Sequence, residues 1–408
     1  MSGLATRPFS AALIALSFSS LCLFSGGLQT QAIAQGTSQD TSQQTSTTDP
    51  TRFEDPAAFV YVLNSPSSNK VEITGYRADS RGVLTLVPGS PFSTEMTYGA
   101  SIAANQKFLF ATSGIDIYSY FITSEGTLQQ TNSVNAQKFN LNNCGGPQAL
   151  FLDRSGSSLY DLDFYSDCAN NAYQSFSSAN STGDLSYVGV TAVSTPIFEV
   201  PLSFVGNNEY AYGASCYHWI QQVFGFRRNA DGSLTDLNIN PAMPVAKTNQ
   251  LYCPNLAAAD KANHVAVPMQ ALDLYTLQPV GPGSIATYTA DSTGALTTKS
   301  TYSNMPQVLV GSVNAVSMSP SGKLLAVAGT NGLQVFHFNG SYPVTEFGGL
   351  LTKDSVDQIS WDDQNHLYAI SQSTGLLFVF RISSTRRTPA PGSPYTIAHP
   401  NRIAVLSK

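Results

Sequence analysis

The chain has 408 residues, a formal net charge of −6 and only 11% charged residues, so most of its polar positions hold uncharged side chains. This length suits one large all-β domain or two ordinary domains. No cluster of Lys and Arg side chains provides the phosphate-neutralising surface that nucleic acid requires, so we expect no nucleic-acid partner.

The first residues, 1–34, have the pattern of a secretory signal peptide. An apolar run over about residues 9–24 is followed by Ala32-Ile33-Ala34, the small-x-small form after which a signal peptidase cuts. The run is short for a bilayer span. We therefore expect cleavage near Ala34, no membrane span afterwards, and an extracytoplasmic location, either periplasmic or secreted. A lipid anchor at Cys22 is the alternative, although a bulky Leu precedes it where such sites favour a small residue.

Residues 35–56 contain a tract rich in Gln, Ser and Thr with no apolar periodicity. Such a segment buries too little apolar surface to offset the conformational entropy lost on ordering. We expect a linker there, followed by one folded domain over residues 57–408.

Four cysteines follow the predicted cleavage site: Cys144, Cys168, Cys216 and Cys253. An even number in an exported protein indicates disulfides, with three possible pairings. Proximity in the sequence favours Cys144 with Cys168 and Cys216 with Cys253. A metal site is the competing interpretation, but the four are scattered and form no Cys-x-x-Cys pair, so we expect none.

One turn motif recurs five times after the linker. In each copy polar residues precede a Gly, and a Leu follows two positions later; the glycines are Gly82, Gly126, Gly183, Gly232 and Gly294. Gly supplies the positive φ that a tight hairpin needs, and the Leu begins the inward alternation of the next strand. The motif predicts five hairpin tips.

A second pattern, apolar strand, polar turn, apolar strand, recurs six times; its copies begin at Ser101, Ala149, Leu202, Leu256, Val316 and Ile359. A seventh inner strand, Arg402–Ser407, lacks a partner after it, and Phe59–Ser65 lacks one before it. Spacings of about 43 to 59 residues are typical of propeller blades with loop insertions. The sequence predicts an all-β, seven-bladed β-propeller with four-stranded antiparallel blades, whose first blade is completed by the C-terminal strand.

Several turns are also similar to those of a known family. The twin segments Val87–Phe92 and Ala390–Tyr395 share a Pro-Gly-Ser-Pro core, and the hairpins carry Pro-Ser-Gly or Asp-Arg-Ser-Gly turns. Over about residues 57–408 the chain resembles the lactonase-type seven-bladed propellers, the family of 6-phosphogluconolactonase and the carboxymuconate-lactonising enzymes. The resemblance implies the propeller fold and, for enzymatic members, lactone chemistry.

The positions that carry catalysis in enzymatic members differ in this chain. There the resemblance would place a His, an Asp-Leu-Gly stretch, a Gly-Pro-Arg-His stretch and an Asn-Glu pair. At these positions the chain has Gly145–Gln148 without the His, Asp161–Asp163 with only part of the second stretch, Glu199–Leu202 without the Arg and His, and Ser215–His218 without the Glu. The family's acid, base and anion clamp therefore do not carry over.

Ligands of propellers bind around the central tunnel, on the face where the inner strands begin. Candidate catalytic residues there are His218, as a general base, and Asp357 with Arg402, which together suit an anion or a polarised carbonyl. The alternatives are that His218 packs as a loop cap, and that Asp357 and Arg402 pair with each other or with loop backbone.

Further candidates for substrate binding lie on the same face: Asp161, Asp163, Glu199, Tyr217, His399 and Arg402. Asp161 and Asp163 share one face of a strand and, with Asp167, raise calcium as a possibility. No loop with the Gly and terminal Glu of an EF-hand accompanies them, so a solvated polar loop is the preferred interpretation. His264, His337 and His366 fall in or beside strands, and we expect structural roles for them.

Three functions fit these observations. The first is an exported, monomeric protein that binds a small molecule or a protein on its tunnel face, without a cofactor. The second is a hydrolase of a sugar lactone or related ester with a rearranged site. The third is a structural protein of the cell surface, held on the linker at residues 35–49.

Overall fold

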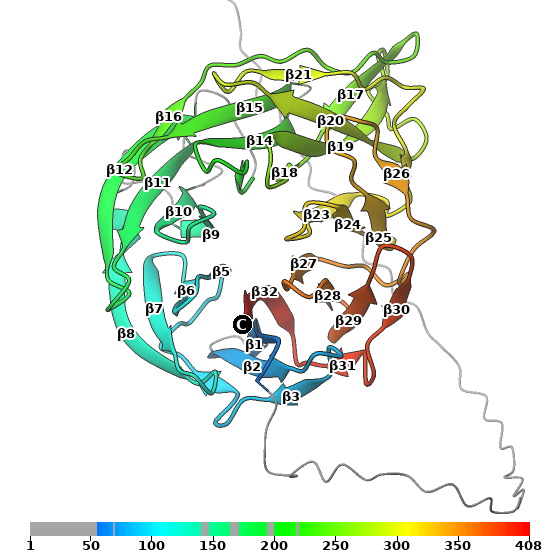
Figure 1. Cartoon of the computed structure of the whole chain (residues 1–408). Helices are drawn as coiled ribbons and strands as arrows, with labels where there is room; N and C mark the ends of the chain where they lie inside the picture. Colours follow the sequence, from blue (N-terminus) through cyan, green and yellow to red (C-terminus); the bar gives the residue numbers. More distant parts are fainter. Residues whose placement is uncertain (1–54, 68–69, 140–146, 164–170, 194–199, 218–219) are drawn as a thin grey trace, which may run out of the picture. The chain divides into compact units, whose positions relative to one another are not determined.

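Seven antiparallel sheets are arranged as blades around a common axis in the computed structural model, which describes residues 55–67, 70–139, 147–163, 171–193, 200–217 and 220–408 (Figure 1). The prediction of an all-β, seven-bladed propeller is confirmed. In every blade the strand nearest the axis is followed outward by three more. The helical content of the described residues is one short 3-10 turn, η1 (Ala136–Phe139).

From the axis outward, each of the first three blades has four main strands. Blade 1 consists of β32 (Pro400–Ser407), β1 (Ala58–Ser67), β2 (Lys70–Ala78) and β3 (Leu84–Leu86), with β4 (Phe92–Ser93) paired to β2. Blade 2 consists of β5 (Ser101–Ala104), β6 (Phe108–Thr112), β7 (Asp116–Ile122) and β8 (Leu128–Asn135). Blade 3 consists of β9 (Pro147–Leu152), β10 (Ser158–Asp163), β11 (Asn171–Ser178) and β12 (Leu185–Val193).

The other four blades follow the same order, with a divided inner strand in blade 5. Blade 4 consists of β13 (Ser203–Phe204), β14 (Tyr210–Tyr217), β15 (Ile220–Arg228) and β16 (Leu234–Asp236). Blade 5 consists of β17 (Gln250–Pro254) and β18 (Ala258–Ala259), then β19 (His264–Asp273), β20 (Gly283–Ala290), β21 (Leu296–Thr298) and β22 (Gln307–Val308). Blade 6 consists of β23 (Val313–Met318), β24 (Leu324–Gly329), β25 (Gly332–His337) and β26 (Thr345–Glu346). Blade 7 consists of β27 (Gln358–Trp361), β28 (His366–Ser371), β29 (Leu376–Ile382), β30 (Arg387–Pro389) and β31 (Tyr395–Thr396).

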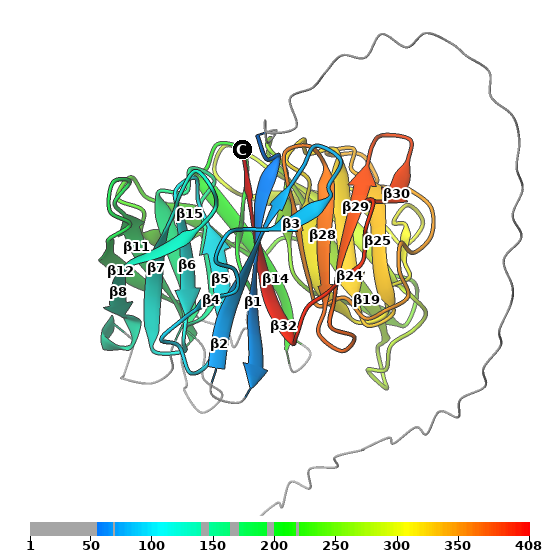
Figure 2. The same ribbon diagram turned by 90° about the horizontal axis from the view of Figure 1, so that it is seen from below.

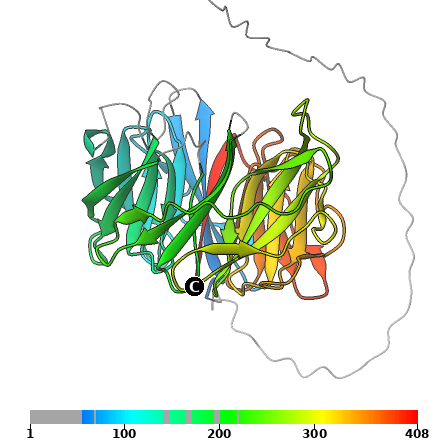
Figure 3. The ribbon, with the colours of Figure 1, turned by 90° about the horizontal axis from the view of Figure 1, so that it is seen from above.

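The ring closes where β32 pairs with β1. The antiparallel register runs from Ala58 opposite Ser407 to Asn64 opposite Pro400, so the predicted partnership of the last strand with Phe59–Ser65 is confirmed. Figure 2 shows β32 in red beside β1 in blue, and Figure 3 brings the green and yellow strands of blades 4 and 5 to the front. Closure leaves no blade with an uncovered face.

Apolar side chains fill the spaces between blades. In the described residues each of the seven blade interfaces holds one hydrophobic cluster, as between blades 1 and 2, where Phe59, Tyr61 and Leu109 are all 0% exposed. A single blade has two apolar faces and cannot bury them alone, so stability comes from neighbouring blades.

The predicted hairpin tips join the two outer strands of their blades, and each tip glycine has a positive φ. The tip also contacts the preceding blade. In three cases a buried tyrosine hydroxyl on the second strand of that blade donates to the tip carbonyl: Tyr61 to Gly126 at 2.9 Å, Tyr160 to Gly232 at 2.8 Å and Tyr212 to Gly294 at 2.9 Å. We call these contacts tyrosine latches. The recurring Gly thus serves both turn formation and blade packing.

The twin Pro-Gly-Ser-Pro segments have the same structure in blades 1 and 7. Each contains a cis Ser-Pro peptide bond, at Ser90-Pro91 and at Ser393-Pro394. The serine hydroxyl accepts from a backbone N–H of the third strand in its blade, Gly75 to Ser90 and Val379 to Ser393, both at 2.9 Å. The two segments therefore bind back onto their own sheets and allow β4 and β31 to pair there.

One predicted disulfide is confirmed. Cys216 on β14 and Cys253 on β17 are bonded, with their Cα atoms 5.2 Å apart, so the bond joins blades 4 and 5. Cys144 and Cys168 lie outside the described residues, as do residues 1–34 and most of the predicted linker. Nowhere in the part of the chain that the structure describes does a helix have the length and apolar character to span a membrane.

Candidate ligand-binding site in the central tunnel

A cavity of about 330 Å³ lies in the centre of the ring, and we call it the tunnel cavity. All seven blades contribute to it through the residues at the start of their inner strands, most of them small or apolar, such as Ala149, Ala257 and Ala315. Arg402 is the one charged residue among the described residues that line it. An uncompensated guanidinium in a mostly neutral cavity favours an anionic ligand.

Arg402 is half-buried at the start of β32. Its Nη1 donates to the backbone oxygen of Asn401 at 3.0 Å and to the Oδ1 of the same residue at 2.7 Å. Its Nε and Nη2 donate to no acceptor in the described part of the chain. Gln358, at the equivalent position of blade 7, also lines the cavity, and its side-chain amide has no hydrogen bond to the described residues. Because β27 lies beside β32, the cavity combines a guanidinium and an amide from neighbouring strands.

Asp357 precedes Gln358, and its carboxylate does not pair with Arg402. Its Oδ2 instead accepts from the backbone N–H of Gln372 at 2.7 Å. The side chain of Gln372 then donates to the backbone oxygen of Asn401 at 3.1 Å. Asp357 and Arg402 are thus joined indirectly. Asp357 is bound to loop backbone, which was one of the alternatives that the sequence left open, whereas Arg402 is bound to Asn401 of its own strand.

Asparagines at the start of three inner strands link neighbouring blades. Each side-chain amide donates to a backbone carbonyl of the next blade: Asn255 to Val313 at 3.1 Å, Asn314 to Val356 at 3.0 Å and Asn401 to Gly99 at 2.7 Å. Blade 7 has Asp357 at this position, and a carboxylate cannot donate, so Gln372 makes the link to blade 1 in its place. The signal for these links was in the sequence, as an Asn near the start of the inner strand in three repeats.

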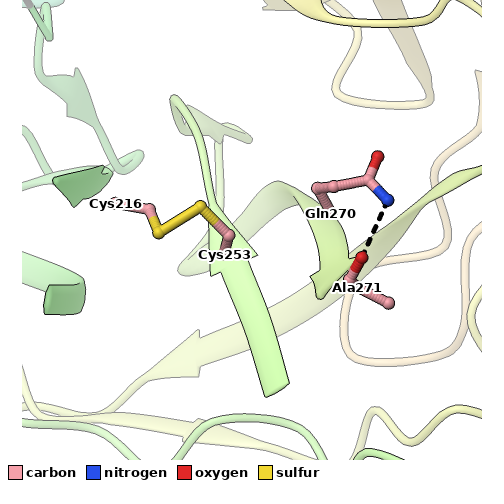
Figure 4. The surroundings of a disulfide bond; sticks show 4 residues. All are labelled: Cys216, Cys253, Gln270 and Ala271. Carbon is pink, nitrogen blue, oxygen red and sulfur yellow. Dashed lines mark hydrogen bonds between the residues drawn. A yellow bond between two sulfur atoms is a disulfide. The ribbon is translucent and has the colours of Figure 1, made fainter. Parts of the chain in front are cut away.

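A second cavity, of about 400 Å³, lies beside the disulfide between blades 4, 5 and 6. Its lining includes the bonded pair Cys216 and Cys253 and the side chain of Gln270 (Figure 4). The other lining residues are neutral, and no charged residue lines the cavity within the described part of the chain. The Gln270 amide donates to the backbone oxygens of Ala271 at 3.0 Å and Gly281 at 3.1 Å. Its donors are therefore used to hold the loop, and the cavity has little directed polarity.

The remaining predicted site residues are dispersed. Asp161 is fully buried in β10, directly opposite Gln174 in the sheet, and does not line either cavity. His399 is exposed just before β32 and has a φ of 48°. Asp163 ends β10 and Tyr217 ends β14. Glu199 and His218 lie outside the described residues, so their proposed roles stay predictions.

Two histidines expected to be structural belong to turns between inner and second strands. His264 Nδ1 lies 2.8 Å from Asp260 Oδ2, and His366 Nδ1 lies 2.6 Å from Asp362 Oδ2. In both turns the other carboxylate oxygen accepts the backbone N–H of the same histidine. Each aspartate thus closes its turn through two contacts, in agreement with a structural role.

The fold is similar to those of several solved structures. A putative 6-phosphogluconolactonase from Bacteroides fragilis has a TM-score of 0.64 and 14% identity, covering 88% of this chain and 100% of its own. A second from Bacteroides uniformis gives 0.64 and 12%, covering 86% and 100%. A periplasmic gluconolactonase from Pseudomonas aeruginosa gives 0.59 and 14%, covering 86% and 99%.

This chain has the lactonase-type propeller fold. No protein-family model and no curated protein matches the sequence, so the likeness is one of structure. The likeness of fold holds at only 12–14% sequence identity to these structures. The fold alone does not determine the reaction, because function depends on the residues of the site.

Proposed function

We propose that this lactonase-type propeller binds a small carboxylate-bearing ligand in the tunnel cavity, with Arg402 as the anion anchor. The observation that carries the proposal is that Arg402 is the one charged residue among the described lining residues, and that its Nε and Nη2 have no protein acceptor there. Gln358 supplies an amide from the neighbouring blade. A guanidinium with two nitrogens available to donate is suited to a carboxylate.

Binding is favoured over hydrolysis by the chemistry of the described lining. Hydrolysis of a lactone needs a group that activates water or accepts a proton, and a guanidinium stays protonated at every physiological pH. Among the described residues of the tunnel cavity we find an anchor but no carboxylate or imidazole. The alternative, a sugar-lactone hydrolase, is supported by the shared fold with putative 6-phosphogluconolactonases.

Calorimetric titration tests the proposal. Gluconate serves as the carboxylate probe and glucose as its uncharged counterpart. We expect saturable binding of gluconate and no binding of glucose. The affinity for gluconate should fall about ten- to a hundredfold in Arg402→Ala, because a hydrogen bond to a charged group contributes about 1.5–3 kcal/mol. Arg227→Ala is the matched control, since Arg227 is an exposed arginine paired with Glu209 in blade 4. Unchanged affinity in Arg402→Ala contradicts the proposal.

The hydrolase alternative is tested separately with a pH-stat and gluconolactone. Turnover above the buffer rate that is lost in both Arg402→Ala and His218→Ala would support the alternative. Acid release at the buffer rate with the unmodified protein would reject it.

We also propose that the propeller acts outside the cytoplasm. The signal-like first 34 residues, the bond between Cys216 and Cys253, and the fold shared with a periplasmic gluconolactonase support this. N-terminal sequencing of the exported protein should give Gln35 as the first residue. A lipid-modified Cys22, or recovery of the full-length chain in the cytoplasm, would contradict cleavage after Ala34.

A further inference from the structure

A third cavity, of about 310 Å³, lies at the junction of blades 7 and 1. We call it the arginine pocket. Its walls come from the turn before β28 and from the hairpin tips of blades 7 and 1. These turns lie on the face of the ring where the inner strands end, and the tunnel cavity is lined by residues at the start of the inner strands. Its lining includes Arg381, Arg386, His366 and Ser80, so it is distinct from the tunnel cavity.

The sheet of blade 7 fixes the floor of the arginine pocket. His366 on β28 lies directly opposite Arg381 on β29, and Arg381 lies directly opposite Thr388 on β30. Residues opposite one another in an antiparallel sheet present their side chains on the same face. The imidazole, guanidinium and hydroxyl therefore form one row, and the row is anchored because His366 is 3% exposed and bound to Asp362.

The hairpin tips complete the walls. Arg386 belongs to the tip of blade 7, where its backbone N–H donates to the Ser383 hydroxyl at 3.0 Å. The tip of blade 1 approaches from the other side, with Gly82 packed against the His366 ring and Ser80 in the pocket lining. Closure of the ring is thus required to form the pocket, since Ser80 and Arg386 come from opposite ends of the propeller sequence.

The charge of the arginine pocket is not neutralised by the protein. Neither the Arg381 nor the Arg386 guanidinium donates to an acceptor within the described residues, and no carboxylate lines the pocket there. Asp362 is satisfied by His366 and by the Tyr368 hydroxyl at 2.9 Å, and Asp79 by Arg81. Asp363, in the same turn as Asp362, is not among the lining residues.

We propose that the arginine pocket binds the phosphate group of a soluble phosphate monoester. Two guanidiniums supply up to ten N–H donors on planar forks, which suit the tetrahedral oxyanion better than a single anchor does. The hydroxyls of Ser80 and Thr388 make no hydrogen bond to the described residues, so they add donors for the same oxygens. A cavity of this size holds a phosphate and a small organic group.

Titration calorimetry with glycerol 3-phosphate, with glycerol as the uncharged counterpart, tests the site on the full-length protein. We expect saturable 1:1 binding of glycerol 3-phosphate and no binding of glycerol. The affinity should fall about tenfold in Arg381→Ala, about tenfold in Arg386→Ala, and further when both arginines are replaced. Arg227→Ala should leave the affinity unchanged. A loss of binding in Arg402→Ala instead would assign the phosphate ester to the tunnel cavity and overturn the proposal. All four arginines are at least partly exposed, so melting curves should confirm that the variants fold.

The proposal is overturned if glycerol 3-phosphate does not saturate the protein. It is also overturned if the variant that carries both Arg381→Ala and Arg386→Ala binds glycerol 3-phosphate as tightly as the parent protein. A lipid headgroup presents the same chemistry, so vesicles of phosphatidylcholine with and without phosphatidic acid form a second arm. Arginine-dependent binding to the phosphatidic acid vesicles, without binding of glycerol 3-phosphate, would also overturn the assignment to a soluble ligand.

Discussion

Replacing Gly126 with Ala tests whether the hairpin tips hold the blades together. A Cβ atom at Gly126 would lie 2.5 Å from Cε1 and 2.6 Å from Cδ1 of Phe59, whose ring is 0% exposed. The φ of +86° adds backbone strain for any side chain. Overpacking a core costs about 1–3 kcal/mol, and a left-handed conformation costs about 1–2 kcal/mol for a residue with a Cβ. We expect a loss of about 2–5 kcal/mol in the free energy of unfolding.

The matched control for Gly126→Ala is Gly281→Ala. Gly281 has a similar φ of +71°, and no atom lies within 4 Å of the added Cβ, so only the backbone term applies. The difference between the variants, about 1–3 kcal/mol, isolates the contact with Phe59.

Thermal unfolding followed by circular dichroism measures this difference. With an unfolding entropy of about 2.1 cal/mol/K per residue and roughly 350 residues in the propeller, 1 kcal/mol lowers Tm by about 1.4 °C. Gly126→Ala should therefore melt about 1.5–4 °C below Gly281→Ala. If the two variants melt together, the tip does not pack against the preceding blade as described.

Three further outcomes follow from the ring. Deleting residues 401–408 removes most of β32 and should abolish the cooperative melting transition, whereas a truncated protein with the parent's Tm would contradict closure by this strand. Cys216→Ser with Cys253→Ser should lower the free energy of unfolding by about 4 kcal/mol, from the chain entropy of a cross-link between residues 37 apart, as urea titration measures. A loss below about 1 kcal/mol would argue against that entropic contribution. Burial raises the pKa of Tyr160 from 10.0 to about 12, so the folded state favours the neutral phenol; its contribution is complete below pH 10 and is lost as the pH rises toward 12. Unfolding followed by phenolate absorbance between pH 10 and pH 12 should show this loss in the free energy of unfolding. Tyr160→Phe should reduce the loss, and an equal loss in the variant would contradict the contribution of Tyr160.

The architecture was predictable because a propeller repeats. Five copies of the polar-Gly-x-Leu turn and the unpaired strand at Arg402–Ser407 were sufficient to predict the blades and their closure, and the register of Phe59 opposite Leu406 agrees with that prediction. Local chemistry sets each turn, and the repeat count sets the ring. Neither depends on knowing which side chains meet across the tunnel.

The candidate sites were less predictable because they join residues from separate repeats. Arg402 was identified from its place at the start of an inner strand, but Gln358 was missed, since an isolated Gln gives no signal in a sequence. The arginine pocket was missed for a related reason. Arg381, Arg386 and Ser80 meet only after the ring has closed, so no local pattern connects them.

The pairing of β1 with β32 also limits when blade 1 can be completed during synthesis. Val60 is synthesised 345 residues before its partner Val405, so blade 1 lacks its inner strand while the other six blades are translated. Contacts this distant in sequence form late and slow the folding of a chain. Until then, the apolar edge of β1 stays unpaired and open to association with other chains. If the chain is exported while it is still being synthesised, the ring can therefore close only after β32 has also crossed the membrane.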